Sequence, residues 1–96
     1  MQSHVTPLND AVQLGRANKV SALLAGGTDP NEPGTGESGM VPLLWACIEG
    51  HTEIAAALLA AGAKVDQARD DGATPLIIAC EEGHTEIVAA LIAAGA

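Results

Sequence analysis

Aromatic and basic residues are scarce in this 96-residue chain. It has one Trp, no Phe and no Tyr, and only four Lys and Arg residues against twelve Asp and Glu. With a formal net charge of −8, the chain is repelled by phosphate backbones and by anionic membrane surfaces, so we expect neither nucleic-acid binding nor membrane binding. The partner that such a surface favours is a protein with a basic or mixed-charge surface.

Long apolar runs and a leader-like start are also missing. No stretch approaches the roughly 18 residues of a membrane span, and residues 1–5 show no basic segment followed by an apolar one. We therefore expect an unprocessed chain in the cytoplasm. A secreted effector that acts inside a host cell would have the same composition, so both settings stay open.

Cysteine is limited to Cys47 and Cys80, which are 33 residues apart. If that spacing reflects stacked units, the two residues lie about one helix diameter apart, roughly 10 Å. A disulfide needs Cα atoms within about 7 Å, so we expect both thiols to stay reduced, as suits a cytosolic protein. Burial as small packing residues is one interpretation of the pair, and redox sensing is the other.

What the chain does contain is a repeated phrase. Pro-Leu-x-x-Ala-Cys-x-Glu-Gly-His-Thr-Glu-Ile occurs from Pro42 to Ile54 and again, 33 residues later, from Pro75 to Ile87. A period of this size is typical of stacked repeat units, each of which depends on its neighbours for a hydrophobic core. Because 48% of the residues are hydrophobic and almost none is aromatic, Ala, Leu, Ile and Val must build that core.

Local residue choices predict two helices in each of three units. Pro at the start fits the first turn of a helix, and Gly at the end can adopt the left-handed conformation. The first helices are predicted to begin at Pro7, Pro42 and Pro75 and to end at Gly15, Gly50 and Gly83. The second helices are predicted over about 18–25, 52–61 and 85–94. Thr74 can cap its helix through its side chain, whereas Val41, at the same place in the second unit, cannot.

Thr74-Pro75-Leu76 with Ala79, continued by the segment from Gly83 to Val88 and closed by Gly95-Ala96, resembles the ankyrin-repeat family over nearly the whole chain. The resemblance implies an all-α fold class, an ankyrin-repeat solenoid of stacked helix-turn-helix units with β-turn or hairpin fingers. It implies a single domain over 1–96, with repeat 1 at about 4–36, repeat 2 at about 37–69 and repeat 3 at about 70–96. The His that this family usually has after Thr-Pro-Leu is replaced here by Asn9, Leu44 and Ile77.

Members of this family bind proteins through the turn tips and the concave face of the first helices. The resemblance thus implies a non-enzymatic protein–protein interaction module that uses no cofactor. When the binding positions of the family are transferred to this chain one by one, the surface also includes Gln13, Leu14, Glu37, Ser38 and Ala73. From it, the partner-binding candidates are Met40, Trp45, Ile48, Glu49, Asp70, Asp71, Glu81 and Glu82.

An apolar anchor at Met40 and Ile48 beside an acidic edge fits a basic or amphipathic partner segment. The alternative is an acidic face that is only solvated. Trp45 is either an anchor at this surface or a residue buried between units.

Metal binding and catalysis are not expected. His51 and His84 recur with Glu53 and Glu86, but side chains from different units lie too far apart for one tetrahedral metal site. We interpret the two imidazoles as bonding the backbone at the start of the second helices. Periodic surface positions assemble no Ser/His/Asp set, phosphate-binding loop or carboxylate pair.

The two ends of the predicted stack differ in polarity. The first unit is cap-like, because its apolar pattern is broken by Asn9, Asp10, Gln13, Arg16, Asn18 and Lys19. The third unit stays apolar, and the outer face expected there includes Ile78, Val88 and Ile92. Because repeat stacks need polar end units, we expect either a fragment of a longer array or self-association as a homodimer through these three residues.

Overall fold

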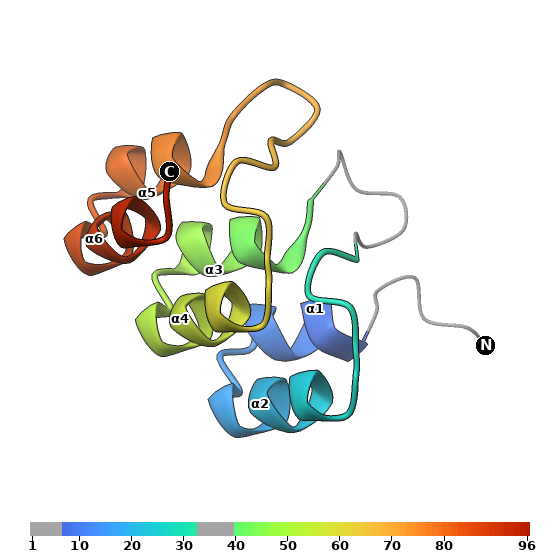
Figure 1. The fold of residues 1–96 in the computed structure, drawn as a ribbon. Coiled ribbons are helices and arrows are strands. Elements are labelled where there is room, and N and C mark those ends of the chain that lie inside the picture. The colour runs from blue at the N-terminus through green and yellow to red at the C-terminus, as the bar shows by residue number, and fades with distance from the viewer. Residues whose placement is uncertain (1–6, 33–39) are drawn as a thin grey trace.

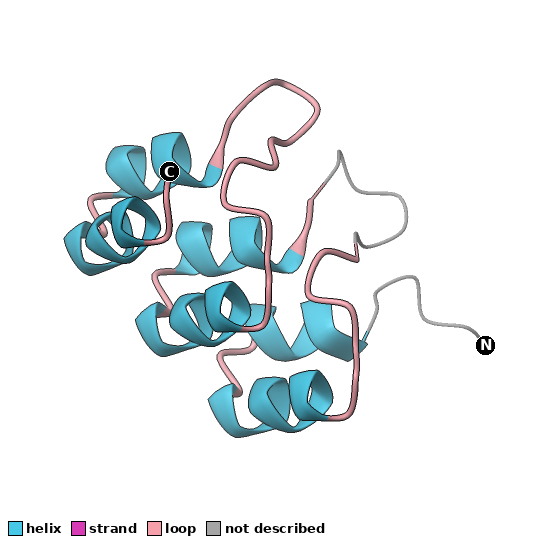
Figure 2. Ribbon diagram, viewed as in Figure 1, coloured by secondary structure: helices cyan, strands magenta, loops and turns pink. Residues whose placement is uncertain are grey.

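The computed structural model describes residues 7–32 and 40–96, which form six helices and no strand (Figures 1 and 2). The helices follow one another in three pairs: α1 (Pro7–Gln13) and α2 (Ala17–Ala25), α3 (Pro42–Glu49) and α4 (Thr52–Ala60), α5 (Pro75–Glu82) and α6 (Thr85–Ala93). Glu37, Ser38 and the first residues of the first unit lie outside the described part. Helices α1, α3 and α5 pack in one layer and α2, α4 and α6 in the other, so the predicted all-α stack of helix pairs is confirmed.

The helix ends follow the predicted chemistry. Thr74 caps α5, since its Oγ1 accepts a hydrogen bond from the Ile77 amide at 3.2 Å. Val41 occupies the same place before α3 and makes no side-chain cap. Gly50 and Gly83 end α3 and α5 with the same left-handed φ of 77°, a conformation that costs other residues about 1 kcal/mol or more.

The two repeated histidines join neighbouring pairs of helices. The His84 Nε2 atom lies 3.4 Å from the carbonyl oxygen of Ile48, and with its proton on Nε2 the ring donates to that oxygen. The ring also covers Gly50, and His51 covers Gly15 in the same way. The predicted bond to the backbone is confirmed for His84, but its acceptor lies in α3 of the preceding unit. Neither histidine caps its own helix, so the predicted place of that bond at the start of the second helices was wrong.

One hydrophobic core runs through all three pairs. Its fully buried large side chains include Leu8, Val12, Val20, Val41, Leu43, Leu44, Ile54, Leu58, Ile87 and Leu91. Burying an aliphatic side chain of this size contributes about 1.5–3 kcal/mol, so this core supplies the main driving force for folding. Asn9 is buried with them, whereas the sequence placed it on the polar outer face of the first unit.

The connector that precedes α3 is tied to the one that follows α4. The side chain of Asn31 donates to the Gly62 carbonyl oxygen at 3.2 Å, and its oxygen accepts from the Lys64 amide at 2.7 Å. A single amide side chain thus satisfies a donor and an acceptor of the next turn, which fixes the distance between successive connectors.

Candidate partner-binding surfaces

The carboxylates predicted to bind a partner are exposed on adjoining elements. Glu49 lies at the end of α3, Glu81 and Glu82 lie at the end of α5, and the turn that leads into α5 carries Asp70 and Asp71. Because α3 packs against α5, these groups form an acidic edge along one layer of the stack.

Ile48 and Trp45 are the apolar candidates of α3, and both are half-buried against the core. Each side chain therefore leaves part of its surface in contact with water. Ile48 directly precedes the exposed Glu49. The structure thus places a half-buried apolar side chain beside an exposed carboxylate, and it exposes less apolar surface here than the sequence indicated.

Met40 does not belong to this surface. Its side chain is only 4% exposed and is part of the hydrophobic core. Ala73, at the same place before α5, also packs against the core, so the residue at this point turns inward in both units. A flexible thioether fills such an irregular space well, and the expectation of an exposed anchor at Met40 was wrong.

An ion pair within the connector to α5 was not anticipated from the sequence. Arg69 donates from Nε to Asp71 Oδ1 at 3.1 Å and from a terminal nitrogen to Oδ2 at 3.0 Å. The same carboxylate accepts from the Ala73 amide at 3.0 Å. The Arg69 hydrogen bond and then the Ala73 amide hold the pKa of Asp71 below its usual value. A basic residue two places before the second Asp of Arg-Asp-Asp-Gly was the signal for this contact.

The pairing changes the charge of the acidic edge. The hydrogen bond that Arg69 donates to Asp71 raises the pKa of Arg69, and Glu81 adds a smaller electrostatic effect in the same direction. The negative charge of Asp71 is therefore compensated by Arg69 within the turn. The other exposed carboxylates of the acidic edge are Asp70, Glu49, Glu81 and Glu82.

The outer face of the third unit differs from the predicted self-association face at one residue. Ile78 is only 3% exposed and lies in the core, because α5 turns it inward within the stack. Val88 is half-buried, and Ile92 is 58% exposed. Cys80 is exposed as well, whereas Cys47 is buried, so the prediction of two buried thiols holds for one of them.

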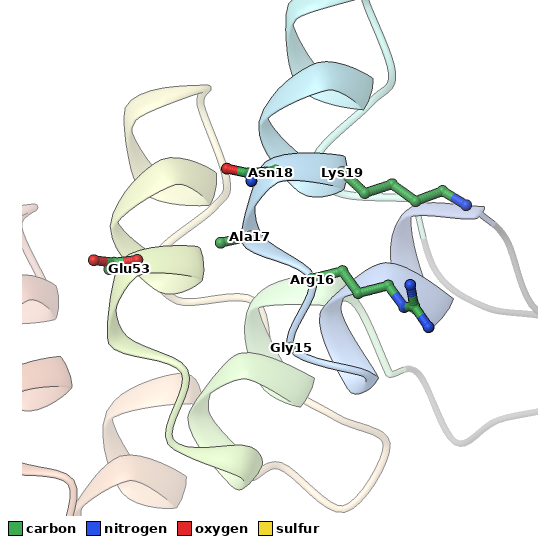
Figure 3. Close-up of a pocket in the computed structure, with 6 residues that line it drawn as sticks. All are labelled: Gly15, Arg16, Ala17, Asn18, Lys19 and Glu53. Carbon is green, nitrogen blue, oxygen red and sulfur yellow. The ribbon is translucent and has the colours of Figure 1, made fainter.

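An open hollow of about 570 Å³ lies at the start of α2, lined by Gly15, Arg16, Ala17, Asn18, Lys19 and Glu53 (Figure 3). The side chains of Arg16 and Lys19 extend away from α4, which carries Glu53. Among residues 7–32 and 40–96, no group of three His, Cys, Asp or Glu side chains could hold a metal ion. Over the same residues, no helix is long and apolar enough to cross a membrane.

Comparison with known proteins identifies a family of similar chains. A sequence model described as ankyrin repeats (3 copies) matches residues 8–96. The crystal structure of the human ASB11 ankyrin repeat domain is 36% identical, with a TM-score of 0.86 over 94% of this chain and 40% of that one. An ankyrin repeat domain from Acinetobacter baumannii AYE is also 36% identical, with a TM-score of 0.89 over 96% of this chain and 48% of that one.

The chain therefore spans less than half the length of either solved structure. No curated protein sequence matches it significantly.

Proposed function

The chain belongs to the ankyrin-repeat family, and on that basis we propose that it is a protein-binding module whose contact surface combines Ile48 with Glu49, Glu81 and Glu82. Ankyrin repeats in general bind proteins rather than catalyse reactions. The observation that carries the proposal is a half-buried apolar side chain on α3 beside exposed carboxylates on α3 and α5.

The chemistry of this surface favours a basic, amphipathic partner segment. The apolar side of such a segment would cover Ile48, and its Lys or Arg residues would approach the acidic edge. The chain has four basic residues. Of these, Arg69 is paired with Asp71, Arg16 and Lys19 lie on α2 or next to it, and Lys64 lies in the connector between α4 and α5. Complementary charges at a rim mainly raise the association rate and set its salt dependence.

A matched pair of double variants tests the proposal. Proteins that bind to the immobilised chain are first purified. The rate at which each of them associates is then measured for the wild-type chain and for the double variants Glu81→Lys/Glu82→Lys and Glu53→Lys/Glu86→Lys. Both double variants make the net charge less negative by the same amount, but Glu53 and Glu86 lie on α4 and α6, in the other layer of the stack. We expect the first variant to slow association by roughly tenfold at low salt and to flatten its salt dependence, and the second to change both much less.

Equal effects of the two double variants would show that only the total charge matters, and would contradict the proposed surface. Ile48→Ala is a second, less disruptive probe, since it shortens a half-buried side chain without adding a charge. It should accelerate dissociation rather than slow association, because apolar anchors act mainly after the encounter.

A further inference from the structure

The turn before α5 contains a pair of residues that can react with each other. Asp71 is followed by Gly72, and nowhere else in the sequence does an Asp or Asn precede a Gly. Because glycine has no side chain, its amide nitrogen can approach the carboxyl group of the preceding residue without obstruction. The Asp71 side chain is 61% exposed, and a β-carbon on Gly72 would meet no described atom within 4 Å. Both residues are therefore accessible to water.

The reaction that this pair can undergo is isomerisation through a succinimide. The Gly72 nitrogen forms a bond to Cγ of Asp71, and its proton and the hydroxyl of the carboxyl group leave together as water. Water then adds to the main-chain carbonyl carbon of Asp71, whose bond to the Gly72 nitrogen breaks. The product has the same atoms as the starting chain and the same oxidation state. Its main chain, however, runs through Cβ and Cγ of Asp71 and is longer by one methylene group.

The structure holds the Asp71 carboxyl group in the form that reacts least. Only the neutral acid has a hydroxyl that can leave, whereas Arg69 donates to both carboxylate oxygens, at 3.1 and 3.0 Å, and favours the ionised form. The Ala73 amide donates to the same carboxylate at 3.0 Å. Three hydrogen bonds therefore oppose protonation of Asp71 and rotation of its carboxyl group toward Gly72.

The attacking nitrogen of Gly72 is held as well. Its N–H donates to the Arg69 carbonyl oxygen at 2.8 Å, and the Arg69 amide donates to the Ala73 carbonyl oxygen at 3.0 Å. These two bonds close the main chain of the turn. The nitrogen must lose its proton to react, and here that proton is bonded to a carbonyl oxygen. Arg69 thus contacts both reacting groups, one through its guanidinium and the other through its main chain.

From this geometry we propose that Asp71–Gly72 is a site of spontaneous isomerisation and that the Arg69 side chain preserves its native form. Arg69 is a positioning residue, because it acts through the ionisation and the orientation of the Asp71 carboxylate. In the isomer, the longer main chain no longer matches the hydrogen bonds that close the turn between Arg69 and Ala73. Thr74, whose hydroxyl caps α5, follows directly, so isomerisation weakens the start of this helix. The proposal does not depend on the protein-binding function proposed above.

The test follows the isomer at Asp71 over time in folded protein at neutral pH. Peptide mapping, with fragmentation that distinguishes aspartate from isoaspartate, compares the wild-type chain with Arg69→Gln. Because an exposed ion pair contributes modestly, we expect the isomer to form roughly fivefold faster in Arg69→Gln. Arg16→Gln removes the same charge outside the turn and should keep the wild-type rate. Asp70 precedes Asp71 rather than a glycine, and it should form much less isomer in every chain.

Asp71→Asn separates the ion pair from a general ordering of the turn. An amide side chain closes the same succinimide with loss of ammonia, but it has no negative charge to pair with Arg69. We therefore expect Arg69→Gln to accelerate the reaction of Asp71 and to change the deamidation of Asp71→Asn by less than about twofold. Circular dichroism and urea unfolding verify that each variant is folded.

A conservative variant completes the set. Arg69→Lys retains a positive charge but cannot make the bidentate contact, so its rate should lie between those of the wild-type chain and Arg69→Gln. It replaces Arg69→Gln if that variant does not fold. Equal rates at Asp71 in the wild-type chain and in the folded variant overturn the proposal. So does an equal acceleration of Asp71 and of Asp71→Asn, since this assigns the effect of Arg69 to the order of the turn alone.

Discussion

A β-carbon placed on Gly50 would lie 2.6 Å from Cε1 of His84. The helix end of the second unit and the imidazole of the third therefore share a space that admits no further atom. Gly50 is needed there for two reasons, because its φ of 77° is left-handed and because the ring lies against it. Gly83 has the same φ but no ring over it, which separates the two requirements.

The first prediction compares Gly50→Ala with Gly83→Ala. Both substitutions force a left-handed alanine, at a cost of about 1 kcal/mol. Only Gly50→Ala also displaces His84, which adds about 1–3 kcal/mol as overpacking. Urea unfolding should show the larger loss for Gly50→Ala, and His84→Ala should reduce the difference. Equal losses would mean that the ring moves aside freely.

The second prediction concerns the capping hydroxyl of α5. Thr74→Val removes the acceptor for the Ile77 amide while preserving the shape of the side chain, so the free energy of unfolding should fall by about 1 kcal/mol. Val41→Thr supplies the missing cap of α3, but it also places a hydroxyl at a site that is almost fully buried. Its gain should therefore stay below about 1 kcal/mol. A neutral Thr74→Val would show that water replaces the cap.

The third prediction is a loss of stability at alkaline pH that depends on Cys47. Burial raises the pKa of this thiol from 9.0 to about 12. Because the folded pKa lies above the unfolded one, the stabilisation is complete below pH 9 and is lost as the pH rises toward 12. The slope from this one group is about 1.4 kcal/mol per pH unit. Urea unfolding of Cys47→Ala should lack this component, and Cys80→Ala should retain it.

The fourth prediction tests the ion pair in the connector to α5. Arg69→Gln removes the main cause of the lowered pKa of Asp71, so this pKa should rise toward its ordinary value in a carboxyl ¹³C NMR titration. The stabilisation linked to Asp71 is present above the ordinary carboxyl pKa and is lost as the pH falls through the lowered one. Arg16→Gln is the control and should leave Asp71 unchanged. If the pKa of Asp71 in Arg69→Gln stayed the same as in the wild-type protein, the lowered pKa would be assigned to the hydrogen bond from the Ala73 amide alone.

The helices could be read from the sequence because their signals are local. The second helix of the third unit was predicted over about 85–94 and is observed over Thr85–Ala93, since a Thr at the start and a Gly after the end act within one turn. The same holds for the left-handed Gly50 and Gly83. The family assignment followed from these residues, and the sequence match over 8–96 agrees with it.

The direction of single side chains could not be read in this way. Met40 and Ile78 were placed on surfaces and are buried, because a shift of one residue around a short helix or at a loop end exchanges inside for outside. Arg69 was missed because its partner is two residues away in a turn rather than at a periodic position. The contact of His84 with the preceding unit depends on stacking geometry, which only the structure contains.

The order of contacts along the stack also determines how the molecule comes apart. The pair α3–α4 packs against both other pairs, whereas α1–α2 and α5–α6 share no substantial contact with each other. Either outer pair can therefore open while the remaining two stay docked, but opening of α3–α4 separates the chain into two isolated hairpins. We expect amide hydrogen exchange to be slowest in α3 and α4 and to become faster toward both ends of the stack. Exchange in the outer pairs then reports local opening, whereas exchange in the middle pair requires unfolding of the whole chain.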